Sequence, residues 1–139
     1  MKIMIFLEGT TFYTKPILFL FSKHGYKPIG NAVQLINSLH DKGHEIYLCS
    51  YVCSTRRNFI KSVVDYYGMK YTDILCRKKG EQYSDLVEHL RPHILIEDDC
   101  KSIGGLRHCC ITNVDVKIKS SIRSIIVPEF TGIDNIQID

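Results

Sequence analysis

Four short clusters of polar residues in this sequence have the side chains that phosphate chemistry requires. They are Glu8-Gly9-Thr10-Thr11, Ser50, Lys78-Lys79 and Glu97-Asp98-Asp99. Carboxylates bind hard cations such as Mg²⁺, whereas hydroxyl groups and backbone amides bind phosphate oxygens and a lysine neutralises their charge. If the fold brings these groups together, they indicate Mg²⁺-assisted phosphoryl chemistry on a small phosphorylated molecule.

The elements that must position these clusters follow from the pattern of apolar residues. Short apolar runs predict strands at 3–7, 45–49, 72–76, 93–97, 109–112 and 123–127, and helical spacing predicts helices at 31–42, 54–67 and 81–90. Alternating strands and helices are typical of a parallel sheet with helices on both faces. We therefore predict a three-layer, doubly wound α/β fold, whose ligands bind at the carboxyl ends of the strands.

The composition is that of an ordinary globular domain. With 139 residues, of which 45% are hydrophobic and 24% charged, we expect a single domain over residues 1–139. A net charge of +3 without a run of basic residues does not indicate nucleic-acid binding, and no apolar stretch has the length of a membrane span. The six cysteines form no zinc-binding pattern, so we expect buried, reduced thiols in a cytoplasmic protein.

The order and spacing of the polar clusters resemble the four motifs of the haloacid dehalogenase-like (HAD) hydrolases over nearly the whole chain. The sequence FLEGT at 6–10 stands where that family has Asp-x-Asp-Gly-Thr, and Ser50 matches the Ser or Thr of the second motif. One lysine of the pair Lys78-Lys79 matches the third motif, and the pair Asp98-Asp99 matches the acidic fourth motif. The resemblance implies that the first strand lies between the second and the fourth.

The resemblance also implies a role for each matching residue. The catalytic groups would be Glu8, Ser50, Lys79 and Lys78; the phosphate-binding groups would be Gly9, Thr10, Ser50 and Lys79; and the metal ligands would be Glu8, Asp98 and Asp99. The implied cofactor is Mg²⁺. For Asp99, the alternative is that it caps a short helix at 100–103.

The first motif departs from the family pattern at two positions. In the family, the first Asp attacks phosphorus to form an aspartyl-phosphate, and it also binds Mg²⁺. Phe6 stands at that position here and can neither attack phosphorus nor bind Mg²⁺. Glu8 replaces the second Asp, an acid/base, with a longer side chain. We therefore predict a degenerate phosphatase that retains weak Mg²⁺ and phosphate binding. Two alternatives stay open: an active Mg²⁺-dependent phosphatase that uses Glu8 or a metal-bound water, and a non-catalytic binding or regulatory module.

Residues 11–30 are too few for the large cap domain of many HAD hydrolases, so we expect no separate cap domain. Within them, 17–21 has five large apolar side chains in a row, which neither a strand nor a helix can hide against one sheet face. Because large exposed apolar patches mark contacts, we predict a homo-oligomer in which Phe19 and Phe21 are buried between subunits. The alternative is that this loop folds over its own site as a lid.

Overall fold

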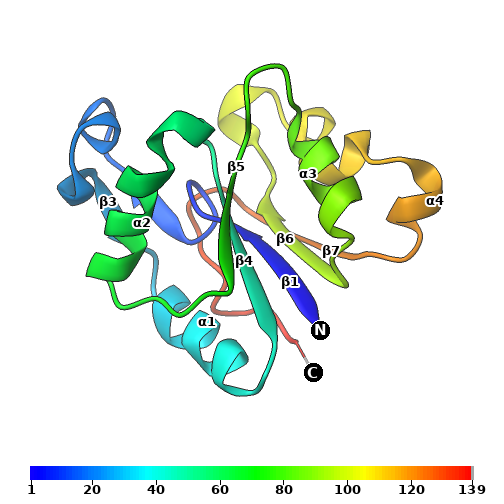
Figure 1. The fold of residues 1–139 in the computed structure, drawn as a ribbon, viewed down its shortest axis with the longest axis horizontal. Coiled ribbons are helices and arrows are strands. Elements are labelled where there is room, and N and C mark those ends of the chain that lie inside the picture. Colours follow the sequence, from blue (N-terminus) through cyan, green and yellow to red (C-terminus); the bar gives the residue numbers. More distant parts are fainter. Residues whose placement is uncertain (139) are drawn as a thin grey trace.

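A five-stranded parallel sheet forms the centre of the protein in the computed structural model, which describes residues 1–138 (Figure 1). In their order across the sheet, the strands are β5 (Asp73–Cys76), β4 (Glu45–Ser50), β1 (Lys2–Phe6), β6 (Ile94–Asp98) and β7 (Arg123–Val127). β1 lies between β4 and β6, as predicted, and Ile5 pairs with Leu48 on one side and Ile96 on the other. Because these central strands are buried on both faces, their sequences are almost continuously apolar.

Helices cover both faces of the sheet, which confirms the predicted doubly wound α/β fold. α1 (Ala32–Asp41) and α2 (Arg57–Tyr66) lie on one face, and α3 (Tyr83–Leu90) and α4 (Val116–Lys119) lie on the other (Figure 1). Successive residues of a strand point to opposite faces. Ile5 therefore packs in one core with Ile36 and Ile60, whereas Phe6 packs in the other with Val87. No helix within residues 1–138 is long and apolar enough to cross a membrane.

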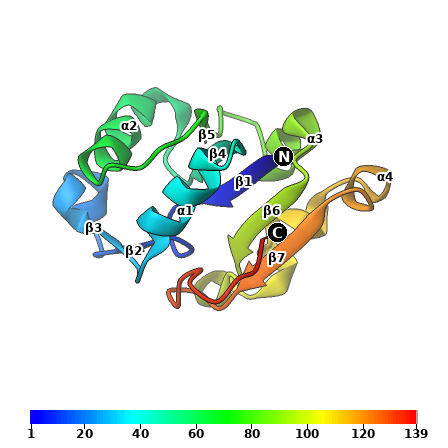
Figure 2. The ribbon, with the colours of Figure 1, turned by 90° about the horizontal axis from the view of Figure 1, so that it is seen from below.

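The chain between β1 and α1 forms a small antiparallel ribbon of β2 (Phe12–Thr14) and β3 (Tyr26–Pro28), which lies near α2 (Figure 2). A tight turn leads from β1 into this ribbon, because the carbonyl oxygen of Leu7 accepts hydrogen bonds from the backbone N–H groups of residues 10–12. The rings of Phe12 and Tyr26 are buried edge to face, with centroids 5.6 Å apart. This pair anchors the ribbon to the core.

Short 3₁₀ helices form many of the connections. They are η1 (Leu18–Leu20), η2 (Lys23–Gly25), η3 (Ser54–Arg56), η4 (Lys101–Ile103), η5 (Leu106–His108) and η6 (Cys110–Asn113). The helix predicted at 54–67 is therefore η3 followed by α2. The helix predicted at 81–90 begins two residues later than expected, after Gln82, which occupies its N-cap position.

The strand predicted at 109–112 is wrong, because most of this segment is the 3₁₀ helix η6. The buried carboxylate of Glu97 accepts hydrogen bonds from the backbone N–H groups of Cys110 (2.6 Å) and Ile111 (3.0 Å). In a strand, those groups would bind a neighbouring backbone. Because the Glu97 side chain binds these N–H groups, Cys110 and Ile111 pack their side chains beside Val87 without joining the sheet.

Five of the six cysteines are buried, as predicted, whereas Cys53 is exposed; all six are free thiols. Burial raises the pKa of Cys76 and of Cys109 to about 11. Because the thiolate is the reactive form of cysteine, these two buried side chains are inert apolar groups near neutral pH.

Candidate functional site

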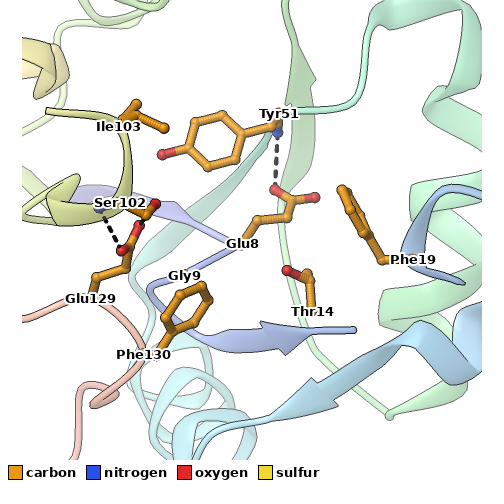
Figure 3. Close-up of a pocket in the computed structure, with 9 residues that line it drawn as sticks. All are labelled: Glu8, Gly9, Thr14, Phe19, Tyr51, Ser102, Ile103, Glu129 and Phe130. Carbon is orange, nitrogen blue, oxygen red and sulfur yellow. Dashed lines mark hydrogen bonds between the residues drawn. The ribbon is translucent and has the colours of Figure 1, made fainter. Parts of the chain in front are cut away.

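The carboxylate of Glu8 lies just beyond the carboxyl end of β1 and is almost fully buried, with 4% of the residue exposed. It accepts hydrogen bonds from the hydroxyl groups of Ser50 (2.7 Å) and Tyr26 (2.6 Å). The backbone N–H of Tyr51 donates a third, at 2.9 Å (Figure 3). Burial, followed by the nearby charge of Glu8, raises the pKa of the Tyr26 hydroxyl. The fold thus brings Glu8 and Ser50 together, as the strand-end positions predicted.

Phe6 is the last residue of β1 and lies on the opposite face of the sheet from Ile5, with 2% of it exposed. Its ring contacts the rings of Tyr51 (centroids 5.9 Å apart) and Tyr83 (5.5 Å), which also contact each other at 5.5 Å. Three packed aromatic rings therefore occupy the region where the HAD resemblance places a nucleophilic carboxylate.

Asp98 ends β6 and approaches the turn after β1 closely. Its Oδ2 accepts a hydrogen bond from the Thr10 hydroxyl (3.0 Å), and its Oδ1 accepts one from the backbone N–H of Cys100 (2.8 Å). Gly9 has a φ of 81°, and a Cβ at this position would lie 2.7 Å from Asp98 Oδ2, so both the turn and the contact require glycine here. Burial, more than the charges of Glu129 and Asp99, raises the pKa of Asp98.

Asp99 holds two backbone segments in place. Its Oδ1 accepts hydrogen bonds from the backbone N–H groups of Lys101 (3.2 Å) and Glu129 (3.1 Å). The first of these agrees with the helix-capping alternative, although Cys100 occupies the N-cap position of η4. Asp99 thus binds the start of η4 and the start of the chain segment that follows β7.

Glu129 is a site residue that the sequence reasoning missed. It follows β7 by two residues, and its carboxylate accepts hydrogen bonds from the backbone N–H (3.0 Å) and the hydroxyl (2.8 Å) of Ser102 (Figure 3). The rule that ligands gather at the carboxyl ends of parallel strands would have found Glu129, because a strand was expected at 123–127.

A cavity of about 330 Å³ opens beside Glu8 (Figure 3). Its lining residues are Glu8, Gly9, Thr14, Phe19, Tyr51, Ser102, Ile103, Glu129 and Phe130. Apolar atoms form most of the wall, and the two carboxylates are its only charged groups among residues 1–138. Burial and the carboxylate of Asp98 raise the pKa of the Tyr51 hydroxyl, which therefore stays protonated.

Lys78 and Lys79 are exposed and line a different cavity, together with Arg77 and residues 53–55. These lysines follow β5, the edge strand that β4 separates from β1. The structure therefore does not bring either lysine to the cavity beside Glu8. The predicted neutralising charge is missing from the lining of that cavity.

The residues present do not fit a Mg²⁺ centre of the HAD kind. In the described part of the chain, no group of three His, Cys, Asp or Glu side chains lies close enough together to hold a metal ion. Glu8, Asp98 and Asp99 instead accept hydrogen bonds from protein donors. Mg²⁺ takes oxygen ligands in a near-octahedral arrangement, and Phe6 places a ring where the family has a carboxylate ligand.

Solved structures with a similar fold include an RNA repair complex and a phosphatase. Two structures of the Pnkp1/Rnl/Hen1 complex, one named as an RNA repair complex, each match 92% of this chain at 12% identity and a TM-score of 0.64. This chain spans only 42% and 47% of the matched chains. D,D-heptose 1,7-bisphosphate phosphatase from B. bronchiseptica, complexed with magnesium and phosphate, matches 94% of this chain and 93% of its own at 10% identity and a TM-score of 0.53.

These similarities concern the fold alone, because identities of 10–12% say little about function. No protein-family model and no curated protein matches the sequence. The match to a phosphatase along nearly its whole length nevertheless agrees with the α/β fold that the HAD resemblance implied.

Proposed function

We propose that this chain is a phosphatase-fold domain without covalent phosphatase chemistry, which acts as a binding module through the cavity beside Glu8. The observation that carries the proposal is the packing of Phe6, which is 2% exposed and touches Tyr51 and Tyr83. A phenyl ring has no lone pair to attack phosphorus. The aspartyl-phosphate route therefore lacks its nucleophile.

The charges around the cavity support the same proposal. Phosphoryl transfer depends on positive charge that stabilises the phosphate oxygens. Glu8 and Glu129 line the cavity, Asp98 lies against Gly9, and the lysine pair 78–79 lines another cavity. A phosphate ester would therefore meet carboxylates without a neutralising group from the lining.

Hydrolysis of p-nitrophenyl phosphate in the presence of MgCl₂ tests the proposal. We expect the unmutated protein to show no turnover above that of Glu8→Gln. Phe6→Asp should also stay inactive, because it restores a carboxylate but no lysine at the cavity. Turnover of roughly 1 per second or more in the unmutated protein, lost in Glu8→Gln, would overturn the proposal.

That outcome would instead support a second candidate, a hydrolase that uses Glu8 itself. The observation in its favour is that Glu8 lines the cavity while its carboxylate accepts a hydrogen bond from Ser50, the residue that matches the second HAD motif. For such an enzyme, Ser50→Ala should reduce turnover without abolishing binding of the substrate. For the binding module, Ser50→Ala changes no turnover, because there is none.

A further inference from the structure

The walls and the charges of the cavity beside Glu8 together define a class of ligand. Phe19, Tyr51 and Phe130 form aromatic parts of its wall, and Glu8 and Glu129 supply its charged groups (Figure 3). We propose that this cavity binds an organic ammonium ion with an apolar body, rather than a phosphorylated compound. This inference rests on the proposed binding function and names its ligand.

Among the residues that the structure describes, the carboxylates of the cavity have no ionic partner. Glu8 is held by two hydroxyl groups and one backbone N–H, all of which are neutral, and Glu129 is held by Ser102. Neither forms a salt bridge within residues 1–138. Arg56 is a basic residue near Tyr26, which donates a hydrogen bond to Glu8. Its guanidinium stacks on Phe59 and donates a hydrogen bond to the Leu20 carbonyl, so it does not pair with Glu8. A bound cation would therefore supply the missing positive charge.

The aromatic rings distinguish an organic cation from a metal ion. A ring attracts a cation through the negative charge of its face, and this attraction grows when the cation is shielded from water. An alkylammonium ion gives up its water readily and also gains from contact with apolar walls. Mg²⁺ keeps its water and takes oxygen ligands, so it gains nothing from contact with the apolar side chains of Phe19, Ile103 and Phe130.

The volume limits the size of the ligand. At about 30 Å³ for each water-sized group, the cavity of about 330 Å³ holds roughly ten non-hydrogen atoms. Benzyltrimethylammonium has about this size and combines a permanent positive charge with an apolar ring. Because a ligand of this size gains only a modest binding energy, its dissociation constant should lie near the millimolar range.

The test measures binding of four probes to the full chain by NMR, with chemical shifts of the Gly9 and Ser102 amides as the readout. We expect benzyltrimethylammonium to bind in the roughly millimolar range, whereas benzyl alcohol, phenyl phosphate and MgCl₂ bind at least about tenfold more weakly. Equal binding of benzyl alcohol would show a merely apolar cavity and overturn the proposal. Tighter binding of phenyl phosphate or MgCl₂ overturns it too, as does the absence of binding by the ammonium ion at about 10 mM.

A matched pair of variants locates the site. Glu129→Gln keeps an acceptor for Ser102 but removes one charge from the cavity, so it should weaken ammonium binding on the order of tenfold. Asp41→Asn removes one charge on α1, where Asp41 pairs with Lys70 at 2.8 Å outside the cavity, and should leave binding unchanged. Equal effects of the two variants would mean that only net charge matters, which contradicts the proposed site.

The two proposals can fail separately. If the ammonium ion does not bind, only the proposed ligand class is wrong. The proposal that the chain has no phosphatase turnover is unaffected. Mg²⁺-dependent turnover that is lost in Glu8→Gln removes the non-catalytic function, whatever the binding experiment gives.

Discussion

Phe6 stabilises the fold through a ring buried between β1 and α3, in contact with Tyr51 and Tyr83. Phe6→Ala should therefore lower the free energy of unfolding by about 3–5 kcal/mol. Phe6→Leu, which keeps an apolar side chain, should cost about 1.5 kcal/mol or less. Urea denaturation followed by circular dichroism measures both. As a control, Phe21→Ala alters a residue that is 76% exposed and should change stability by about 0.5 kcal/mol or less; equal losses at positions 6 and 21 would contradict the buried role.

Glu97 gives the stability of this domain a pH dependence. Burial raises the pKa of its carboxyl group from 4.5 to about 7, although hydrogen bonds from Ile111 and Cys110 lower it. Because this pKa is higher in the folded chain than in the unfolded one, the folded chain binds the proton more tightly. The resulting stabilisation is complete below the unfolded pKa of 4.5 and is lost as the pH rises through about 7. The free energy of unfolding should fall by about 3 kcal/mol between about pH 5 and about pH 8.

Urea titrations at a series of pH values measure this fall. Glu97→Gln removes the titrating group and keeps an oxygen that can accept from Cys110 or Ile111. Its stability should therefore vary less over the same pH range. A residual fall of the same sign is expected from Asp98, whose pKa burial also raises. An unchanged pH profile in Glu97→Gln would show that this carboxyl group is not the cause.

At the scale of elements, the buried strands and their ends can be predicted from the sequence. Parallel strands buried on both faces are continuous apolar runs, such as Ile94–Leu95–Ile96, and the polar residues that directly follow each run mark its carboxyl end. Because β1, β4 and β6 are neighbours, this reasoning correctly places Glu8, Ser50 and Asp98 at one edge of the sheet.

What the sequence does not reveal depends on contacts between distant residues. The segment at 109–112 has the apolar pattern of a strand, but Glu97 binds its backbone N–H groups and turns it into η6. The placement of the lysines depends on strand order, because a loop after an edge strand reaches another cavity. Glu129 could have been found at the end of the expected strand at 123–127, but its approach to the cavity depends on the pairing of β7 with β6, which local periodicity does not identify.

The start of α3 is fixed by a capping interaction between Gln82 and Asp85. The backbone N–H of Asp85 donates to the backbone carbonyl of Gln82 (3.1 Å), and Asp85 Oδ2 accepts from the backbone N–H of Gln82 (2.8 Å). Asp85→Ala removes one of these bonds and a favourable charge in the first turn, so stability should fall by about 1 kcal/mol. Thermal unfolding measures the loss. Gln34→Ala, at an exposed position within α1, is the control and should leave the midpoint nearly unchanged.

At the scale of the whole molecule, the net charge of the chain is positive, whereas the charged groups at the cavity are negative. The chain has a net charge of +3, yet the carboxylates of Glu8, Asp98, Asp99 and Glu129 all gather at one edge of the sheet. The positive charge therefore lies elsewhere on the surface. Since exposed charges are screened within about 10 Å at moderate salt, this distant positive charge does little to draw an anion into the cavity.

The apolar loop at 17–21 has one aromatic side chain that packs on its own domain and two large apolar side chains that are mostly exposed. Phe19 packs on its own domain, with its ring centroid 6.0 Å from that of Tyr26, and lines the cavity. Phe19 thus has a partner in the ribbon of its own chain, and its burial between subunits stays a prediction. Ile17 and Phe21, in contrast, are 70% and 76% exposed.

We expect these two exposed side chains to form a contact between copies of this chain, because soluble proteins seldom leave neighbouring large apolar groups in water. Ile17→Glu combined with Phe21→Glu should convert an oligomer into a folded monomer, measured by size-exclusion chromatography with light scattering. Val116→Glu is the control, since Val116 is 78% exposed on α4 and lies outside the loop. The contact is ruled out if the unmutated protein is already a monomer at high micromolar concentration. It is equally ruled out if Val116→Glu dissociates the oligomer as effectively as the double variant, because repulsion between added charges would then explain both results.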